Sequence, residues 1–404
     1  RVGAEGHATV AATLSALAVA GDVVIGPTNA SSCDVSLDRC SLTLAQALKQ
    51  QTSQVAATNS LLTVADGLIV GYDEGGGVTS DVAACLTFTG PDTVVTCNGG
   101  LVIGHRRSSG RLVIENGATV VANPAATGLP TQLGGSDGLP GHTRLDILSG
   151  GFLDVRQGPL LALHTNASHT SICLGEGGRL QTGVIQDASA VTTCEGTFFF
   201  DGGTLVARED LPDWYASSLP LVASAQALAR FDTAGFTATL THPLTGAGGL
   251  CKLGGGTLFL ADGAPAYLGP TVVSNGVLTL PAVTVLSNDV TVATEGTLTL
   301  GADSAIGSLT LTGTLRGDGL ILLDAAGSAV DQLRIGGTTD SLPHFRFVSH
   351  GALDETAAFT FLLVPPAYSG PVPAVDFPNP GWQVKRSGEG FYAVLNNGTA
   401  LLLK

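Results

Sequence analysis

Short aliphatic strands separated by Gly, Asn or Ser dominate the hydrophobic pattern of this chain from about residue 60 to residue 335. In the stretch LVIGHRRSSGRLVIENGATVV, which begins at Leu101, apolar residues occupy alternate positions and a Gly or Asn follows each run. Strands of four or five residues are not stable as isolated hairpins. Because alternate residues of a strand point to opposite faces, the pattern predicts strands with one apolar face, stacked on one another around a narrow interior.

The fold class predicted from this pattern is all-β, a right-handed parallel β-helix (β-solenoid) with coils of roughly 20 residues. Residues 60–335 are assigned to the solenoid. Residues 1–59 are expected to form an N-terminal cap and assembly segment, because a solenoid that leaves its terminal coil open adds strands from other molecules. Residues 336–404 are predicted to be a short C-terminal module rich in β-hairpins, with an Asn397-Gly398 turn near its end.

Two segments break the strand pattern within the solenoid. Residues 122–143 hold three prolines and five glycines without alternation, so they are expected to loop out of the stack. Residues 208–236 contain Pro212, Trp214, Tyr215 and an Ala-rich run, and they are expected to form a second, partly helical excursion. Both segments are predicted to leave the regular coils.

The most regular block is residues 246–280, GAGGLCKLGGGTLFLADGAPAYLGPTVVSNGVLTL. The residues that matter for its assignment are Gly249, Leu250, Lys252, Gly254, Gly256, Thr257 and Leu258 at its opening, and Tyr267, Gly269, Val273, Gly276, Leu278 and Leu280 at its close. This spacing resembles the autotransporter-associated β-strand repeat, found in bacterial extracellular β-helix and adhesin-like proteins. Pro265 and Ala266 stand where that repeat has Asn-Thr, so the chain departs from the repeat at this turn. The resemblance implies a stacked β-helical scaffold.

Composition and charge narrow the functional classes. The 404 residues are 44% hydrophobic and only 13% charged, which is too apolar for a disordered chain. The net charge of -15, with Lys only at positions 49, 252, 385 and 404, leaves no basic stripe for nucleic acid. No run of 18 apolar residues is present, so no transmembrane segment is predicted. With Arg1 first and no Met in the chain, the amino terminus is interpreted as the product of signal-peptide removal.

The seven cysteines suggest disulfides. Six of them, Cys33, Cys40, Cys85, Cys97, Cys173 and Cys194, form three close couples and suggest three local disulfides. Sequential pairing, Cys33–Cys40, Cys85–Cys97 and Cys173–Cys194, is one of many possible connectivities. The reasoning is that residues about one coil apart lie side by side in a stack, within disulfide reach. Zinc is the competing interpretation, but no CxxC occurs and no histidine stands at ligand spacing, so neither a metal site nor a cofactor is predicted. Cys251 is left over, either as a buried thiol or as an intermolecular bridge.

Few residues are candidates for a catalytic or binding site. Asp146 and Asp154, with Arg144 and Arg156, are the best candidates for a polysaccharide-degrading site, if their strands stack; exposed ion pairs on a solvated face are the alternative. His105, Arg106 and Arg107 form a compact positive patch that suits a glycan or a neighbouring subunit, or is a solvated turn. The sequons at Asn29, Asn166 and Asn397 are glycan sites in a eukaryotic secretory pathway or arise by chance. No catalytic residue is predicted.

The expected function is therefore structural. The chain is predicted to be a secreted or cell-surface β-solenoid, a filament or matrix subunit or an adhesin that acts as a rigid spacer, and not an enzyme. Its partners are expected to be further copies, packed head to tail into an oligomer or fibre, and surface glycans. The candidate assembly residues are the apolar positions near both ends: Val10, Leu14, Leu17, Val19, Val23, Ile25, Leu401 and Leu403. A polysaccharide-binding or polysaccharide-degrading β-helix is the alternative.

Overall fold

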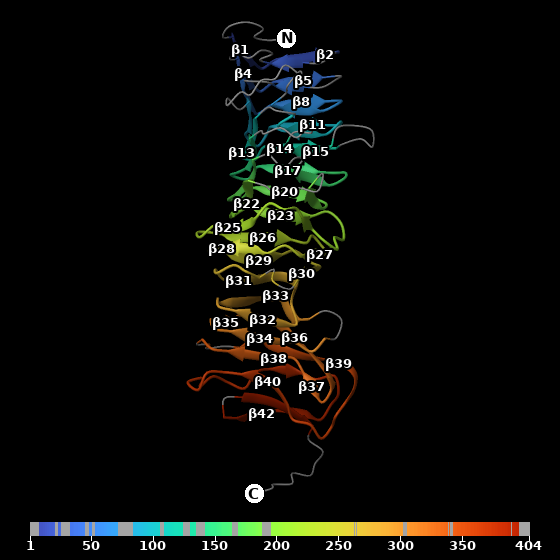
Figure 1. The fold of residues 1–404 in the computed structure, drawn as a ribbon, viewed down its shortest axis with the longest axis vertical. Helices are drawn as coiled ribbons and strands as arrows, with labels where there is room; N and C mark the ends of the chain where they lie inside the picture. The colour runs from blue at the N-terminus through green and yellow to red at the C-terminus, as the bar shows by residue number, and fades with distance from the viewer. Residues whose placement is uncertain are drawn as a thin grey trace. The chain divides into compact units, whose positions relative to one another are not determined.

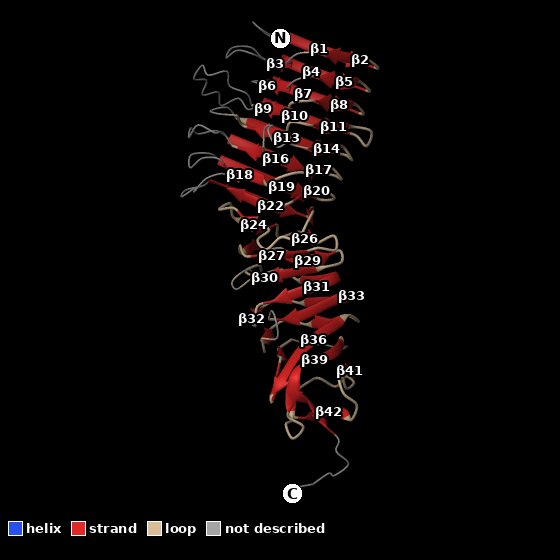
Figure 2. Ribbon diagram, turned by 90° about the vertical axis from the view of Figure 1, so that its right-hand side faces the viewer, coloured by secondary structure: helices blue, strands red, loops and turns tan. Residues whose placement is uncertain are grey.

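A computed structural model of the chain describes residues 8–20, 23–25, 33–44, 48–50, 53–71, 84–105, 109–123, 130–134, 142–163, 169–187, 195–261, 263, 265–301, 305–337, 339, 342–388 and 390–395. The chain divides into two compact units, Arg1–Arg230 and Phe231–Lys404. The regular structure in both units is β-strand, and the described residues contain no helix (Figure 2). The all-β class is therefore confirmed.

Three parallel ladders form the first unit. The strands of the first ladder are β1 (Ala8–Thr13), β4 (Cys33–Asp38), β7 (Ser53–Thr58), β10 (Ala84–Thr89), β13 (Gly110–Glu115), β16 (His142–Ile147), β19 (His169–Gly175), β22 (Glu195–Asp201) and β25 (Leu221–Ala223). Those of the second are β2 (Ala16–Val19), β5 (Ser41–Leu44), β8 (Leu61–Val64), β11 (Val94–Cys97), β14 (Thr119–Ala122), β17 (Phe152–Val155), β20 (Arg179–Thr182) and β23 (Thr204–Ala207). Those of the third are β3 (Val23–Ile25), β6 (Leu48–Gln50), β9 (Leu68–Val70), β12 (Leu101–Ile103), β15 (Thr131–Leu133), β18 (Leu160–Leu163), β21 (Ile185–Asp187) and β24 (Tyr215–Ala216).

Consecutive strands of the chain belong to different ladders, and every third strand pairs in parallel with its equivalent in the next coil. β1 pairs with β4, β2 with β5 and β3 with β6, and the same order continues along the unit (Figure 1). This arrangement is a parallel β-helix, so the predicted fold is confirmed. Because the individual strands are short, the stability of each depends on the coils stacked on either side.

Columns of aliphatic side chains fill the interior of the first unit. One column on the second ladder consists of Leu17, Leu42, Leu62, Val95, Val120, Leu153, Leu180 and Leu205. From Leu62 onward the side chains of this column are at most 2% exposed. Truncating a leucine buried in this way to alanine costs about 2–5 kcal/mol. The apolar residues that alternate along the sequence therefore face the interior, and the residues between them face outward.

The coils of the first unit are less uniform in length than predicted. The register pairs Cys33 with Ser53, which is a coil of the predicted length, whereas it pairs Gly110 with Thr143, which is a much longer coil. The extra residues fall in sequence between strands of the third and first ladders, as at positions 72–83 and 135–141. The ladders stay in register although the number of residues between their strands varies.

The predicted segment boundaries need revision in three places. The described strands of residues 1–59 do not form a separate element, because β1 to β7 pair within the same ladders as the later coils. Residues 122–143 include β15, whose residues are buried and pair with β12 and β18. Residues 208–236 contain strands and no helix, so the expected helical excursion is wrong; Trp214 and Tyr215 are buried in the coil.

The second unit is also built mainly from parallel strands. After β26 (Leu228–Asp232), which spans the boundary, come β27 (Thr237–Leu240), β28 (Leu244–Gly246), β29 (Gly249–Leu253), β30 (Thr257–Leu260), β31 (Thr271–Leu280), β32 (Val283–Leu286), β33 (Val290–Leu300), β34 (Ser308–Leu311) and β35 (Leu315–Arg316). The remaining strands are β36 (Leu320–Gly327), β37 (Ala329–Val330), β38 (Gln332–Ile335), β39 (His344–Leu353), β40 (Phe359–Leu363), β41 (Val375–Asp376), β42 (Trp382–Ser387) and β43 (Gly390–Leu395).

Long strands replace pairs of short strands in the second unit. The first part of β31 pairs with β29, and its second part pairs with β30. β33 then pairs along the whole length of β31, with a register shift between Val273 and Asn275. The register runs from Thr237 to Thr257 and on to Val277, which gives two successive coils of the predicted length. The block that most resembles a known repeat is therefore also where the predicted coil length holds.

Antiparallel pairing closes the second unit. β40 and β42 both pair antiparallel with β43, whereas β38 and β40 pair in parallel. β42 is the last strand of its sheet, and Lys385, Arg386 and Ser387 are exposed on it. Charged side chains on an edge strand oppose the addition of a further strand. The predicted turn at Asn397-Gly398 lies outside the described residues, and the hairpin that the structure describes is β42–β43.

Candidate functional site

The first charged cluster on the outer face surrounds Asp146 of β16. Its carboxylate oxygen Oδ2 accepts a hydrogen bond from Arg111 Nε at 2.7 Å, and Arg144 Nε lies 2.9 Å from Oδ1. Arg111 belongs to the preceding coil, so this ion pair crosses the ladder. The Asp146 side chain is 0% exposed although it is on the outer face, because the two arginines cover it. The cluster stabilises the register of β13 and β16.

A second cluster surrounds Asp154 of β17. Arg156 Nε donates to its Oδ2 at 2.9 Å, and Arg208, two strands further along the second ladder, forms an ion pair with Oδ1. Asp154 is 7% exposed as a residue. Removing one partner of a buried ion pair leaves an uncompensated charge and is strongly destabilising. This cluster therefore joins coils that are two strands apart on the second ladder.

The two aspartates do not form a catalytic pair. The residues that flank Asp146 in the first ladder are Val113 and Cys173, and those that flank Asp154 in the second ladder are Val121 and Gln181. The expectation that the two strands stack on each other is wrong, because β16 and β17 are consecutive strands of one coil on different sheets. Each carboxylate is instead occupied by its own pair of arginines.

Residues with a left-handed backbone conformation, that is with positive φ, form the corner between the first and second ladders. In the first three coils these residues are Leu14 at φ 51°, Arg39 at φ 51° and Asn59 at φ 46°. The left-handed region is unfavourable for residues with a Cβ, least so for Asn. In later coils glycines such as Gly90 and Gly117 take the same conformation at this corner. The chain must therefore turn here in every coil, whatever residue the sequence supplies.

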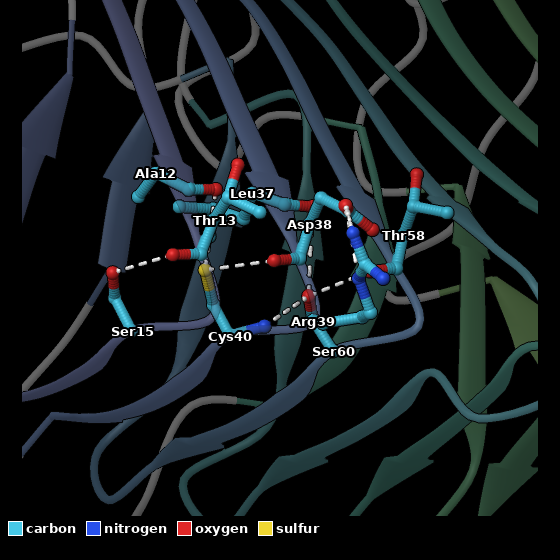
Figure 3. A network of polar contacts seen from close by, with 9 residues as sticks. All are labelled: Ala12, Thr13, Ser15, Leu37, Asp38, Arg39, Cys40, Thr58 and Ser60. Atoms are coloured by element: carbon cyan, nitrogen blue, oxygen red, sulfur yellow. Dashed lines mark hydrogen bonds and ion pairs between the residues drawn. The ribbon is translucent and has the colours of Figure 1, made fainter.

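Small polar side chains follow these left-handed residues and close the corner (Figure 3). Ser15 Oγ donates to Thr13 O at 3.0 Å, and Ser60 Oγ donates to Thr58 O at 2.8 Å. Between them, Cys40 Sγ lies 3.3 Å from Asp38 O, and its backbone N–H donates to Ser60 Oγ at 3.0 Å. Hydroxyl and thiol groups therefore occupy one column and link the first three corners.

The first coil exposes residues that later coils bury. Val10 is 37% exposed, whereas Val35, which pairs with it in the next coil, is 8% exposed. Leu17 begins the interior column of the second ladder and is 59% exposed, and Leu14 at the corner is 73% exposed. Val19 and Val23 are half-buried. The structure thus gathers most of the N-terminal assembly candidates in the first coil of the first unit; the side chain of Ile25 lies outside the described residues.

The predicted disulfides are not present. Cys40, Cys85, Cys97, Cys173 and Cys251 are not disulfide-bonded. Since each predicted bridge includes at least one of these residues, all three predictions are wrong for this structure. The physical reason is clearest in one coil, where Cys85 points outward from β10 while Cys97 points into the interior from β11 and is fully buried. Burial raises the pKa of the Cys97 thiol to about 12.

Several sequence candidates lie outside the described residues. They are Arg106, Arg107, Leu401, Leu403, the side chain of Cys33, Cys194 and the sequon asparagines Asn29, Asn166 and Asn397. Of the predicted positive patch, only His105 is described; it is half-buried, and its backbone N–H donates to Gly71 O at 2.8 Å. These predictions of glycan contact, strand donation and glycosylation stay predictions.

The second unit carries an open groove of about 440 Å³ that the sequence did not indicate. Its floor is an outer-face column in which Phe259 pairs with Thr239 before it and Thr279 after it. Pro281 and Ala282 form one side. No charged residue lines this groove among the described residues. A signal was available in the sequence, because Thr239, Phe259 and Thr279 recur at the spacing of one coil in an outward position.

Comparison with protein families and with curated sequences finds no relative of this chain. No protein-family model matches the chain, and no curated protein sequence matches it. In the part of the chain that the structure describes, no helix is long and apolar enough to cross a membrane. Among the described side chains, no three His, Cys, Asp or Glu residues are grouped so as to hold a metal ion.

Proposed function

We propose that this chain is a structural β-solenoid that associates with further copies of itself through the first coil of its first unit. The observation that carries the proposal is the exposure of Val10 and Leu17, because the next residue of each column is more buried: Val35 is 8% exposed and Leu42 is half-buried. An exposed strand edge with apolar side chains is a template for pairing with another chain. At the other extreme of the sequence, β42 carries exposed charges.

The proposed role is that of a non-enzymatic scaffold, a filament or matrix subunit or an adhesin, at the cell surface or secreted. The interior columns support it, because stacked coils build a stiff element that lengthens by repetition. The two arginine-bound aspartates support the non-enzymatic part, since neither is placed with a second carboxylate. Because no described cysteine is disulfide-bonded, the cysteines give no support for an oxidising compartment. The proposed location outside the cell is supported by the resemblance of residues 246–280 to extracellular repeats and by the acidic, Lys-poor composition.

Sedimentation velocity over a concentration series tests the association. We expect the wild-type chain to form concentration-dependent assemblies, and Leu17→Asp to prevent them, because a carboxylate in the column would have to be buried at the interface. Val283→Asp is the matched control, since Val283 is 77% exposed on an outer face in the second unit. A wild-type chain that stays monomeric throughout, or assembly that survives Leu17→Asp, would contradict the proposal.

A second candidate function is polysaccharide binding in the groove at Phe259. An aromatic ring flanked by two threonine hydroxyls offers a flat apolar surface and hydrogen-bonding groups, the mixture that small neutral ligands need. Affinity electrophoresis in neutral and acidic polysaccharides, with wild type, Phe259→Ala and Thr279→Val, tests it. Retardation that is lost in Phe259→Ala supports binding in the groove. Turnover of a uronate polymer that disappears in Asp154→Asn would instead show an enzyme.

A further inference from the structure

Threonine side chains form two outward columns on four successive strands of the second unit, β27, β30, β31 and β33 (Figure 2). The register places one column at Thr239, Phe259, Thr279 and Thr299, and the other at Thr237, Thr257, Val277 and Thr297. The residues between the two columns point into the interior and are buried: Ala238, Leu258, Leu278 and Leu298. The outer face of these strands is therefore rich in hydroxyl and methyl groups and holds no charged side chain in either column.

The size of this face suits a single extended chain and not a folded partner. Neighbouring strands are about 4.8 Å apart and alternate residues of one strand about 7 Å apart, so the two columns cover on the order of 100–200 Å². A stable protein interface buries about 800 Å² on each partner. A narrow polymer that crosses the four strands along the coil axis would cover both columns.

A second observation, in the groove beside Phe259, points to a ligand with hydroxyl groups. Thr279 lines this groove and is only 3% exposed, yet its hydroxyl makes no hydrogen bond with any residue that the structure describes. A buried hydroxyl without a partner is unfavourable, so such a group calls for one from outside the chain. Phe259, its neighbour in the column, is half-buried. The groove therefore combines an aromatic ring with an unsatisfied hydroxyl.

The charges around the face favour a neutral ligand. Glu295 is the only charged residue in the four strands, and it is exposed two positions before Thr297. It accepts a hydrogen bond from Asn275 Nδ2 at 2.7 Å. A carboxylate at this edge, in a chain with a net charge of -15, repels an anionic polymer, and neither column offers a cation to compensate.

We propose that the two columns of β27, β30, β31 and β33 bind a neutral, unbranched β-linked glycan chain along the coil axis, with one sugar ring packed against Phe259. This rests on the proposed groove binding at Phe259 and extends it from one groove to four strands. The C–H face of a pyranose ring packs on an aromatic ring, as other apolar surfaces do. Threonine hydroxyls both donate and accept hydrogen bonds, so successive sugars meet the same kind of group on successive strands.

Isothermal titration of the full chain with β-1,4-linked glucose oligomers, from the disaccharide to the hexasaccharide, tests the face. We expect the affinity to rise with chain length until the oligomer spans the four strands. Thr297, on the last of these strands, lies outside the groove. Thr297→Val should weaken binding of the hexasaccharide roughly 3- to 10-fold and leave the disaccharide unchanged, because only the longer chain reaches this hydroxyl. Thr310→Val, on the outer face of β34 in a different sheet, is the matched control and should bind like the wild type.

Phe259→Ala separates the extended face from the groove alone. It should weaken binding of every oligomer roughly 10-fold or more, because the ring contact is common to all of them. If that loss is observed but the affinity does not depend on chain length, or Thr297→Val binds the hexasaccharide like the wild type, the extended face is wrong and the groove stands. No binding of any oligomer by the wild type would overturn both. Tighter binding of a galacturonate hexasaccharide than of the glucose hexasaccharide would overturn the neutral class.

Thermal unfolding without ligand separates a lost contact from a lost fold. Valine keeps the β-branched shape of threonine, and Thr297 is on the outer face, so Thr297→Val should melt at the temperature of the wild type. With the hexasaccharide present the wild type should melt at a higher temperature, because a ligand that binds only the folded state stabilises it. An equal shift in Phe259→Ala would overturn the proposal.

Discussion

The ammonium group of Lys252 donates a hydrogen bond to the backbone carbonyl oxygen of Asn275, 3.1 Å away in the next coil. It also donates to the carbonyls of Leu253 at 2.8 Å and Gly254 at 2.7 Å. The lysine is 0% exposed, and burial lowers its pKa to about 8. One buried side chain thus satisfies three carbonyls at the bend between β29 and β30 and at the register shift of β31.

Replacing this lysine should destabilise the second unit. In Lys252→Met the aliphatic stem is retained but the carbonyls of Leu253, Gly254 and Asn275 lose their donor, and we expect a loss of roughly 2 kcal/mol in the free energy of unfolding. The cost of burying the charge offsets part of the three hydrogen bonds, which is why the expected loss is no larger. Urea denaturation followed by circular dichroism measures it. Lys385→Met, on the exposed edge strand β42, should be neutral; equal stability of both variants would contradict this role.

The thiols should react as five separate groups. Under denaturing conditions without reductant, alkylation followed by peptide mass analysis should modify Cys40, Cys85, Cys97, Cys173 and Cys251 in full. In the folded protein Cys97 should stay unmodified, because it is fully buried and only the thiolate is reactive. Half-buried Cys85 should react faster than Cys97. A disulfide-linked peptide that contains Cys85 and Cys97 would show that the sequence-based pairing was right after all.

Strand alternation and turn glycines were enough to predict the parallel β-helix, because both are local features that the stack requires at every coil. The coil length was predicted only where the register is uniform, as from Thr237 to Val277. The disulfide and carboxylate predictions failed because they placed residues of one coil side by side. Cys85 and Cys97, like Asp146 and Asp154, lie on consecutive strands that belong to different ladders, so sequence separation does not give the neighbour of Cys85 or Asp146.

The same limit explains the features that the sequence did not reveal. His142 and His169, whose rings are 5.3 Å apart, are further apart in sequence than one predicted coil, so their contact follows only from the register of β16 and β19. The corner column of Ser15, Cys40 and Ser60 is similar, because its members are joined only through stacked coils. Long-range register is set by packing of the whole interior, which no single segment encodes.

Relieving the left-handed strain at the first corner should stabilise the first unit. Leu14 has φ 51° and is 73% exposed, so its side chain gains little from burial while its Cβ is unfavourable in this conformation. Asn59 occupies the same corner two coils later. We expect Leu14→Asn to raise the free energy of unfolding by roughly 0.5–1 kcal/mol. Leu17→Asn, in an extended strand next to this corner, is the control and should give no gain.

Asp331 should make the stability of the second unit depend on pH between about 4 and 7. Its carboxylate accepts hydrogen bonds from the backbone N–H groups of Gly307 at 2.6 Å and Asp324 at 2.9 Å. Burial, with a smaller effect of the nearby carboxylate of Asp324, raises its pKa to about 7 in spite of these bonds. Asp324 itself lies 2.8 Å from His350 Nε2. The folded protein therefore holds a proton on Asp331 that the unfolded chain releases near pH 4.

A folded-state pKa above the unfolded value means that the protonated carboxyl stabilises the folded unit at low pH. This contribution is complete below the unfolded pKa of about 4 and is lost as the pH rises to about 7, by roughly 2–4 kcal/mol in total. Asp331→Asn cannot titrate, so the difference in unfolding free energy between wild type and variant should change across this range and be constant above it. Urea denaturation at a series of pH values measures the difference. A difference that is flat from pH 4 to pH 7 would show that Asp331 stays ionised in the folded unit.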